Sequence, residues 1–295
     1  MLERKSRLDV LAVSSLILCC FLWGLNQVAV KAALPEVPPL WQAAVRSLGG
    51  MVLVGLWARL RGIAIFTRDG TLRGGLLAGL LFAAEFVCIF VGLQFTTASR
   101  MVVFLYTAPF VVALGMPFIA RAERLSPQQV LGLAVAFAGV AWAFAEGFTK
   151  PAVGAHQWLG DALGLLAGGL WGATTLAIRA SALSNASAEK TLLYQLAVSG
   201  VLLCAGAWVG SPMPATLSML AWSSMAFQIV VVTFFSFLVW FWLVRSYAAT
   251  RLASFTLLTP VFGLLLGVLL LSEPITLRLL LALASVSAGI FLVNR

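Results

Sequence analysis

Apolar residues run along the chain in ten long stretches, which are separated by short segments of proline, glycine and charged residues. Each stretch has the length of an α-helix that crosses a hydrocarbon core of about 30 Å. The pattern predicts membrane-spanning helices at residues 9–31, 39–60, 73–95, 98–120, 127–145, 158–180, 190–210, 218–244, 249–271 and 275–293. We therefore expect an all-α integral membrane protein with ten transmembrane helices.

The composition agrees with a membrane protein. Hydrophobic residues make up 62% of the chain and charged residues 10%, and the mean hydropathy is +1.04. Soluble domains contain about 25% charged residues, so a soluble fold is excluded. The net charge of +9 comes from Lys and Arg residues at span ends and not along one basic face. We expect contact with the lipid bilayer and none with nucleic acid.

The positive residues also predict the topology. With a cytoplasmic N-terminus, the inside segments hold fourteen Lys and Arg residues and the outside segments four. Positive residues favour the cytoplasmic side, so both termini are expected in the cytoplasm. The expected location is a bacterial inner membrane, which the protein crosses several times.

The chain repeats itself, which is its most informative feature. Residues 21–31 align with residues 169–179 at an offset of 148, and an offset of 151 aligns the third and fourth spans with the eighth and ninth. The equivalent pairs include Trp23 and Trp171, Gly24 and Gly172, Arg100 and Arg251, Pro109 and Pro260, and Glu123 and Glu273. We predict a first five-helix repeat at 1–146, a linker at 147–157 and a second repeat at 158–295.

Five spans are an odd number, so the second repeat enters the membrane from the opposite side. Such an inverted repeat allows the two halves to exchange conformations and gives alternating access. A duplicated membrane protein that transports nothing is the alternative.

These repeated motifs resemble those of one family. The Trp-Gly pairs of the first and sixth spans, the Ala-Ser-Arg and Ala-Thr-Arg stretches at 98–100 and 249–251, and Glu123 and Glu273 look like the EamA family of the drug/metabolite transporter superfamily. The resemblance implies ten helices around a central cavity and a role in export. Richness in Trp and Phe is similar to the bacterial aromatic amino acid exporters. The family resemblance identifies no residue of this chain that would determine substrate specificity.

Glu85 is the first candidate site residue, because it lies about twelve residues into the third span. An ionisable side chain at that depth is costly unless it faces a cavity, finds a partner or is protonated, so a functional role is the default. The repeat aligns it with Ser236 in the eighth span. A neutral or Arg-paired structural glutamate is the alternative.

Four residues beyond Ser236 on the same helical face lies Trp240, and four residues beyond Glu85 lies Ile89. An aromatic wall beside a polar group suits an aromatic or apolar amino acid. Trp240 could instead serve packing alone.

Trp23 and Asn26 are three residues apart, as are Trp171 and Thr174, so each pair shares a helix face. In one interpretation, each pair presents an aromatic ring and a hydrogen-bonding group to the substrate. In the other, the rings pack at one end of the helix bundle and the polar side chains form hydrogen bonds between helices.

Other polar and proline positions leave similar alternatives open. Tyr106 and Gln195 could contact the substrate or join helices. Pro109 and Pro260 are expected to loosen repeat-related helices, as hinges or as static kinks. Arg46 is expected to extend its guanidinium to water, or else to face the cavity, where it would attract a substrate carboxylate or pair with Glu85.

We predict an exporter of small organic solutes, amino acids with aromatic and other apolar side chains among them. Drugs or nucleobase-like metabolites are alternative substrates. The chain carries no nucleophile elbow, metal spacing or phosphate loop, so we expect no enzyme activity, no metal and no cofactor. A channel remains a further alternative, and the oligomeric state stays open.

Overall fold

The computed structural model describes residues 9–119, 126–210, 212, 216–246, 256 and 258–293 of the 295-residue chain. In this part of the chain every regular element is a helix. The first half contains α1 (Val10–Ala33), α2 (Pro39–Leu60), α3 (Leu72–Gly92), α4 (Ala98–Leu105), α5 (Ala108–Ile119) and α6 (Pro127–Thr149). The second half contains α7 (Gln157–Arg179), η1 (Ala182–Asn185), α8 (Ala188–Gly210), α9 (Met219–Ala226), η2 (Phe227–Ser236), α10 (Phe237–Ser246), α12 (Leu258–Leu271) and α13 (Leu277–Val293).

Eight segments are long and apolar enough to cross a membrane, and α12 and Leu277–Gly289 are shorter apolar helices. The chain is therefore a multi-pass, all-α membrane protein. All ten predicted spans overlap these segments, while a count of ten transmembrane helices stays a prediction. Of the ninth predicted span, residues 249–255 and 257 lie outside the described residues, as do Glu123 and Arg251.

Short polar motifs fix several helix starts. Asp9 accepts a hydrogen bond from the Ala12 amide at the start of α1 (2.9 Å), and Thr97 accepts one from the Arg100 amide at the start of α4 (3.1 Å). Such side chains replace the missing backbone partners of the first turn. Within the predicted linker at 147–157, residues 150–156 between α6 and α7 are non-helical.

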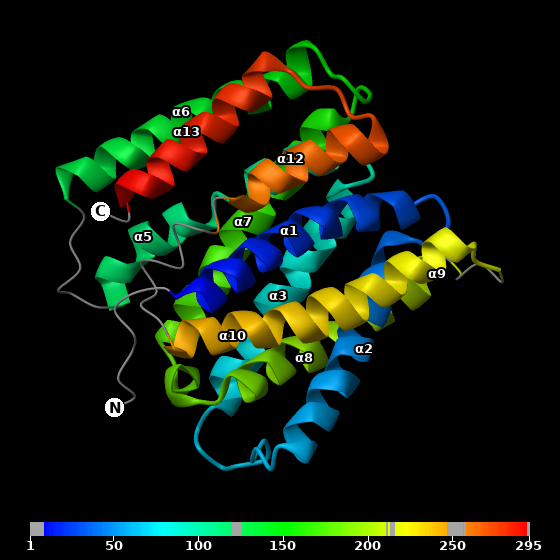
Figure 1. The fold of residues 1–295 in the computed structure, drawn as a ribbon, viewed down its shortest axis with the longest axis vertical. Coiled ribbons are helices and arrows are strands. Elements are labelled where there is room, and N and C mark those ends of the chain that lie inside the picture. Colours follow the sequence, from blue (N-terminus) through cyan, green and yellow to red (C-terminus); the bar gives the residue numbers. More distant parts are fainter. Residues whose placement is uncertain are drawn as a thin grey trace.

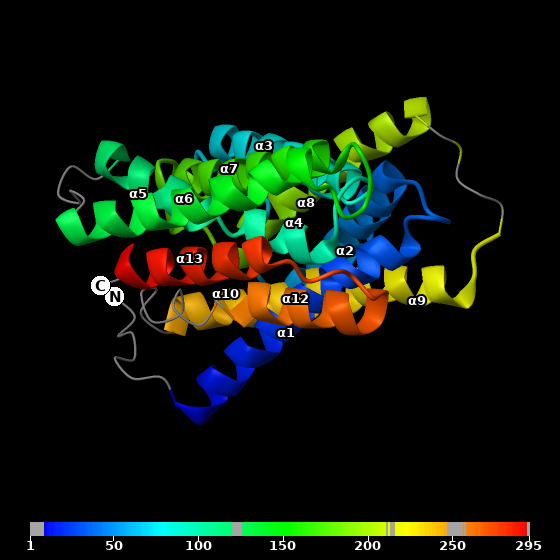
Figure 2. The same cartoon turned by 90° about the horizontal axis from the view of Figure 1, so that it is seen from above.

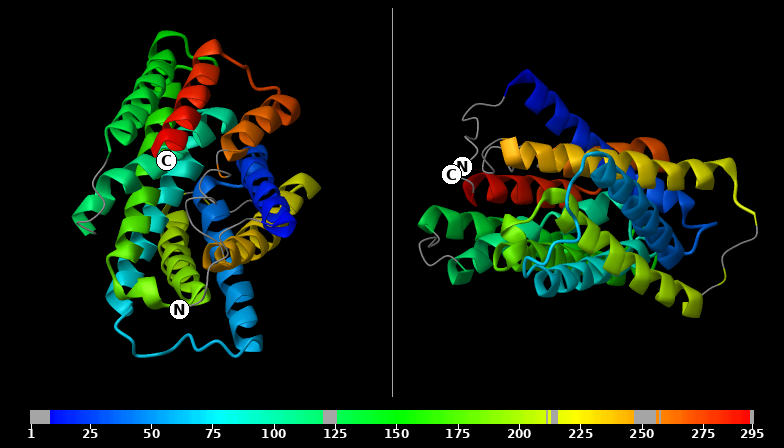
Figure 3. Two further views of the ribbon diagram at one scale, coloured as in Figure 1. Left: turned by 60° about the vertical axis from the view of Figure 1, so that its left-hand side comes forward. Right: turned by 90° about the horizontal axis from the view of Figure 1, so that it is seen from below.

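The helix contacts reflect the two repeats, because exchanging the equivalent helices of the two halves gives the same pattern of neighbours. α1 packs against α12, and its repeat partner α7 packs against α4 and α5. α2 packs against its own partner α8, and α6 against its partner α13. The α6–α13 pair forms one edge of the bundle and α2 the opposite edge (Figures 1 and 3). The start of α1 and the end of α13 lie at the same end of the bundle (Figure 2).

Repeat-related glycines permit equivalent close approaches. A Cβ atom on Gly24 would lie 2.7 Å from the Gly263 nitrogen of α12, and one on Gly172 would lie 2.6 Å from the Val111 Cβ of α5. Both positions therefore require glycine, which is the small-residue packing typical of membrane helices.

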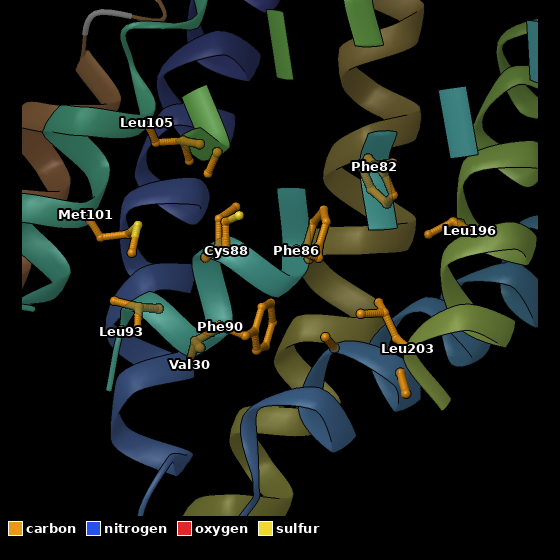
Figure 4. Packing of buried hydrophobic residues seen from close by; sticks show 14 of the residues in the cluster. Val30, Phe82, Phe86, Cys88, Phe90, Leu93, Met101, Leu105, Leu196 and Leu203 are labelled. Atoms are coloured by element: carbon orange, nitrogen blue, oxygen red, sulfur yellow. The ribbon is translucent and has the colours of Figure 1, made fainter. Parts of the chain in front are cut away.

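The largest apolar cluster among the described residues draws on α1, α2, α3, α4, α7 and α8. Phe82, Phe86 and Phe90 line one side of α3 (Figure 4), and their rings contact in sequence with centroid distances of 4.4 and 5.8 Å. Leu196 and Leu203 of α8 pack in the same cluster. This packing fixes α3, which carries Glu85.

The predicted fourth span is not one continuous helix. α4 ends at Leu105 and α5 begins at Ala108, so Tyr106 and Thr107 form a turn inside the span. Pro109 accounts for this break, because it has no N–H to donate to the Leu105 carbonyl four residues earlier and its ring clashes with that carbonyl. Pro260 lies in the first turn of α12.

Candidate functional site

Three predicted site residues meet between α1, η2 and α10. The Trp23 indole donates a hydrogen bond from Nε1 to the Ser236 Oγ (3.0 Å). The rings of Trp23 and Trp240 stand edge to face, with centroids 5.4 Å apart. Ser236 is fully buried and donates its own hydroxyl to the Val232 carbonyl (2.6 Å). These residues form an aromatic wall with one buried hydroxyl.

The repeat partner of Trp23 makes a similar contact. Trp171 of α7 packs edge to face on Tyr106, with centroids 5.5 Å apart. Tyr106 is buried and lies in the turn between α4 and α5. Each of the two repeat-related tryptophans therefore contacts an aromatic ring from another part of the chain. For Trp171 that ring lies in the break of the fourth span.

Glu85 is buried on α3, and its Oε2 has no hydrogen-bond partner in the described structure. Arg46 is buried as well, at 3% exposure, so the expectation that it extends to water is wrong. Its guanidinium carbon lies 4.3 Å from the centroid of the Phe86 ring, which holds the side chain inside the bundle. A buried guanidinium and a buried carboxyl group therefore lie on neighbouring helices of the first half.

The other predicted residues are not brought to one place. Ile89 packs in the apolar cluster of α3. The Thr174 hydroxyl donates to the Leu170 carbonyl (2.9 Å), and the Gln195 amide donates to the Thr191 carbonyl (3.2 Å), so both bond within their own helices. The Oδ1 of Asn26 is buried without a partner in the part of the chain that the structure describes.

The segment that carries Ser236 has an unusual backbone. Residues Phe227–Ser236 form a π-helix, whereas the repeat-related stretch of α3 is an ordinary α-helix. π-helical turns are rare and are frequent at functional sites. Hydrophobic periodicity did not predict this segment, because its residues are those of any apolar helix.

The sequence analysis also missed a buried ion network at the end of the bundle opposite the two chain ends. The Arg100 guanidinium binds Asp161 through Nε (3.0 Å) and Nη2 (2.7 Å), and binds Glu146 through Nη1 (2.9 Å). Thr96 donates its hydroxyl to Asp161 (2.6 Å), and Thr276 donates to Glu146 (2.8 Å). All three charged groups are more than nine-tenths buried.

Glu273 extends this network across the repeats. Its carboxylate accepts hydrogen bonds from the backbone amides of Ala98 (2.6 Å) and Ser99 (2.9 Å) at the start of α4. A carboxylate at a helix N-terminus is favoured by the helix dipole. Nearby, the Lys31 ammonium donates to the Leu93 carbonyl (2.7 Å) and the Thr96 carbonyl. The ends of α1, α3, α4, α6 and α7 and the α12–α13 connection are thus linked at one end.

A separate ion pair lies at the opposite end of the bundle. The Lys190 ammonium binds Asp69 (2.7 Å) and the Thr67 hydroxyl (2.8 Å), and Thr71 bonds to Asp69 (2.6 Å) and to Tyr194 (3.2 Å). The Lys190 ammonium, together with these hydroxyls, holds the pKa of Asp69 well below its usual range. The connection between α2 and α3 is thereby tied to α8.

Within the described residues, no three His, Cys, Asp or Glu side chains are arranged to hold a metal ion. The described cysteines Cys19, Cys20, Cys88 and Cys204 form no disulfide with one another.

Comparison with known proteins decides the family. A model of the EamA-like transporter family matches residues 10–145 and again residues 158–295. The chain belongs to this family. The EamA-like chain is 30% identical over 281 residues to the uncharacterized transporter YvbV of Bacillus subtilis, a match that covers 92% of this chain and 88% of that protein. It is 26% identical over 322 residues to the uncharacterized transporter sll0355 of Synechocystis, covering 100% and 93%.

A solved crystal structure supports the EamA-like fold alone. It matches with a TM-score of 0.68 at 18% identity, covering 95% of this chain and 94% of that one. Family and relatives together indicate a membrane transporter. The names of these relatives specify no substrate.

Proposed function

We propose that this EamA-like protein exports small organic solutes across a bacterial inner membrane by alternating access, and that amino acids with aromatic and other apolar side chains are among them. The observation that carries alternating access is the buried ion network. It joins Thr96, Arg100 and Glu146 of the first half to Asp161 and Thr276 of the second half. It also joins the amides of Ala98 and Ser99 to Glu273. Opening this end requires these bonds to separate.

The aromatic contacts support the substrate class. Trp23, Ser236 and Trp240 offer ring faces beside one hydroxyl, and Tyr106 and Trp171 offer a second pair of rings. Mostly apolar walls with a few polar groups are typical of small-molecule sites. Pro109 is proposed as a hinge because it adjoins the break in the fourth span, and Pro260 is proposed as its counterpart.

The proposed topology places both termini in the cytoplasm and the ion network on the periplasmic side. The excess of positive residues on the terminal side supports this orientation. The conformation described here is then closed toward the periplasm.

Export is tested with purified protein in proteoliposomes. Labelled phenylalanine, tryptophan, methionine, alanine and adenine are supplied singly, with and without a pH gradient, and empty liposomes serve as the control. Saturable uptake of the aromatic and apolar amino acids is expected, and dependence on the gradient would indicate coupled transport. Uptake of adenine alone would replace the amino acids with nucleobase-like substrates. No uptake of any solute by folded, inserted protein would contradict the proposal.

A further inference from the structure

Two opposite charges lie at the same depth in neighbouring helices. Arg46 lies seven residues from the start of α2, and Glu85 lies seven residues from the end of α3. Consecutive spans run in opposite directions, so these two helix ends lie at the same end of the bundle. At 1.5 Å per residue both side chains are about 10 Å below that end. They belong to α2 and α3, which pack against each other.

Neither charge is neutralised by direct contact with the other. Both side chains are more than nine-tenths buried, yet no ion pair found in the described structure joins them. The Nε of Arg46 and the Oε2 of Glu85 have no hydrogen-bond partner. Each is nevertheless an electrostatic neighbour of the other. Buried charges without a bonded partner are costly, which points to a ligand that satisfies both.

Aromatic rings define the rest of this environment. The Arg46 guanidinium carbon lies 4.3 Å from the Phe86 ring centroid and 5.8 Å from that of Phe237. Phe86 follows Glu85 directly in α3, and Phe237 follows Ser236, the repeat counterpart of Glu85. A positive pole, a negative pole and two apolar rings are therefore grouped between the two halves.

We propose that Arg46 and Glu85 are the two poles of a binding site for zwitterionic α-amino acids. The guanidinium binds the substrate carboxylate, for which its planar fork is suited, and the Glu85 carboxylate binds the substrate ammonium. Phe86 and Phe237 flank the apolar side chain. A zwitterion has no net charge, so it satisfies both buried groups and adds no charge to the membrane interior. This inference rests on the proposed transport function and adds the chemistry of recognition.

The test measures binding, which separates it from transport. Wild-type protein in lipid nanodiscs is titrated calorimetrically with phenylalanine, with phenethylamine, which lacks the carboxylate, and with 3-phenylpropionate, which lacks the ammonium. Charge-assisted hydrogen bonds predict that phenylalanine binds about ten- to hundredfold more tightly than either analogue. Equal binding of the three ligands, or no binding of phenylalanine, would overturn the inference without any variant.

Substitutions of Arg46 and Glu85 then test which charged group of the substrate each residue binds. Arg46→Gln is expected to remove the preference for phenylalanine over phenethylamine, and Glu85→Gln the preference over 3-phenylpropionate. Arg46→Lys, which keeps the charge and loses the fork, should retain part of the preference. Arg278→Gln, at a half-buried arginine on α13 that bonds to Thr149, is the matched control and should change neither ratio. If folded Arg46→Gln keeps the wild-type ratios, the assignment is wrong.

The two proposals fail in different ways. Saturable phenylalanine uptake into proteoliposomes, with binding ratios that do not respond to Arg46 and Glu85, would leave the transport function standing and refute the charged site. Zwitterion binding that depends on both residues, without transport of any solute, would support the site and refute the function.

Discussion

Replacing Arg100 with glutamine removes the only cation that contacts both Asp161 and Glu146 in the described network. The two carboxylates would then remain buried without a bonded counter-charge. Removing one partner of a buried ion pair costs about 3–5 kcal/mol. At about 1.4 kcal/mol per factor of ten, this equals roughly two to three and a half orders of magnitude in a conformational equilibrium.

The cost falls mainly on the conformation in which this end is closed, because opening lets water reach the carboxylates. Alternative conformations of a transporter differ by a few kcal/mol, so this change is large enough to reverse the balance between them. Arg100→Gln is therefore expected to favour the state that is open at the network end.

Accessibility of an introduced cysteine measures this shift. Val30 is fully buried and adjoins Lys31, so Val30→Cys in a background without the native cysteines reports on the network end. A membrane-impermeant maleimide is expected to label it at least about tenfold faster when Arg100→Gln is also present. Arg278→Gln removes a half-buried positive charge from the same end and should leave the rate unchanged.

A second cysteine probe distinguishes opening of the network end from general unfolding. Ala12 is fully buried near the other end of the same helix, and Ala12→Cys should stay protected in the Arg100→Gln variant. The reasoning is refuted if folded Arg100→Gln labels Val30→Cys at the wild-type rate, because the network would then not hold this end closed.

Three further predictions follow from other contacts. Trp240→Ala should weaken transport of phenylalanine more than that of alanine, measured as apparent affinity in proteoliposomes, and an equal loss for both would argue against the aromatic wall. Ser236→Ala leaves the Trp23 indole without its acceptor and should lower stability by about 1–3 kcal/mol in thermal unfolding, whereas an unchanged midpoint would mean that the hydrogen bond contributes nothing. Asp69 has a depressed pKa in the folded state, so its contribution is present above its unfolded pKa and is lost as pH falls through the folded value. Asp69→Asn should speed hydrogen exchange in residues 61–71 at neutral pH, and this difference from wild type should shrink in acid as the bond to Lys190 weakens; equal exchange at neutral pH would refute the anchoring role.

The lengths of the apolar stretches predicted the positions of the spans, because each membrane helix must cross the same thickness of bilayer. The predicted second span, 39–60, has the observed bounds of α2, and the predicted seventh, 190–210, differs from α8 by two residues at its start. Proline chemistry indicated that the fourth span is loosened near Pro109, but the turn at Tyr106 and Thr107 needed the structure. The regular alternation of apolar residues carries no signal for the π-helix.

The sequence allowed individual site residues to be predicted, but it did not predict which of them contact one another. Trp23 and Trp240 followed from helical spacing and from the repeat, but their edge-to-face contact joins residues more than two hundred positions apart. The ion network was missed for the same reason. The sequence indicated Arg100 as an outside positive charge and as part of a repeated motif, but not as an ion-pair partner, because Asp161 lies 61 residues away and Glu146 lies 46 residues away. The sequence signal for this network is the presence of acidic and basic residues at the ends of different spans on the same side of the membrane.

The π-helix of residues Phe227–Ser236 has a consequence for how this protein can change during evolution. In an ordinary α-helix, deleting one residue turns every later side chain by about 100° and destroys the packing beyond it. A π-helix bonds each amide one residue further back, so one of its residues can be lost while the segment shortens to α-helical bonding. The flanking helix then keeps its register. A single deletion here would rearrange the aromatic wall and leave the rest of the bundle in place, which offers a simple genetic route to a new substrate range.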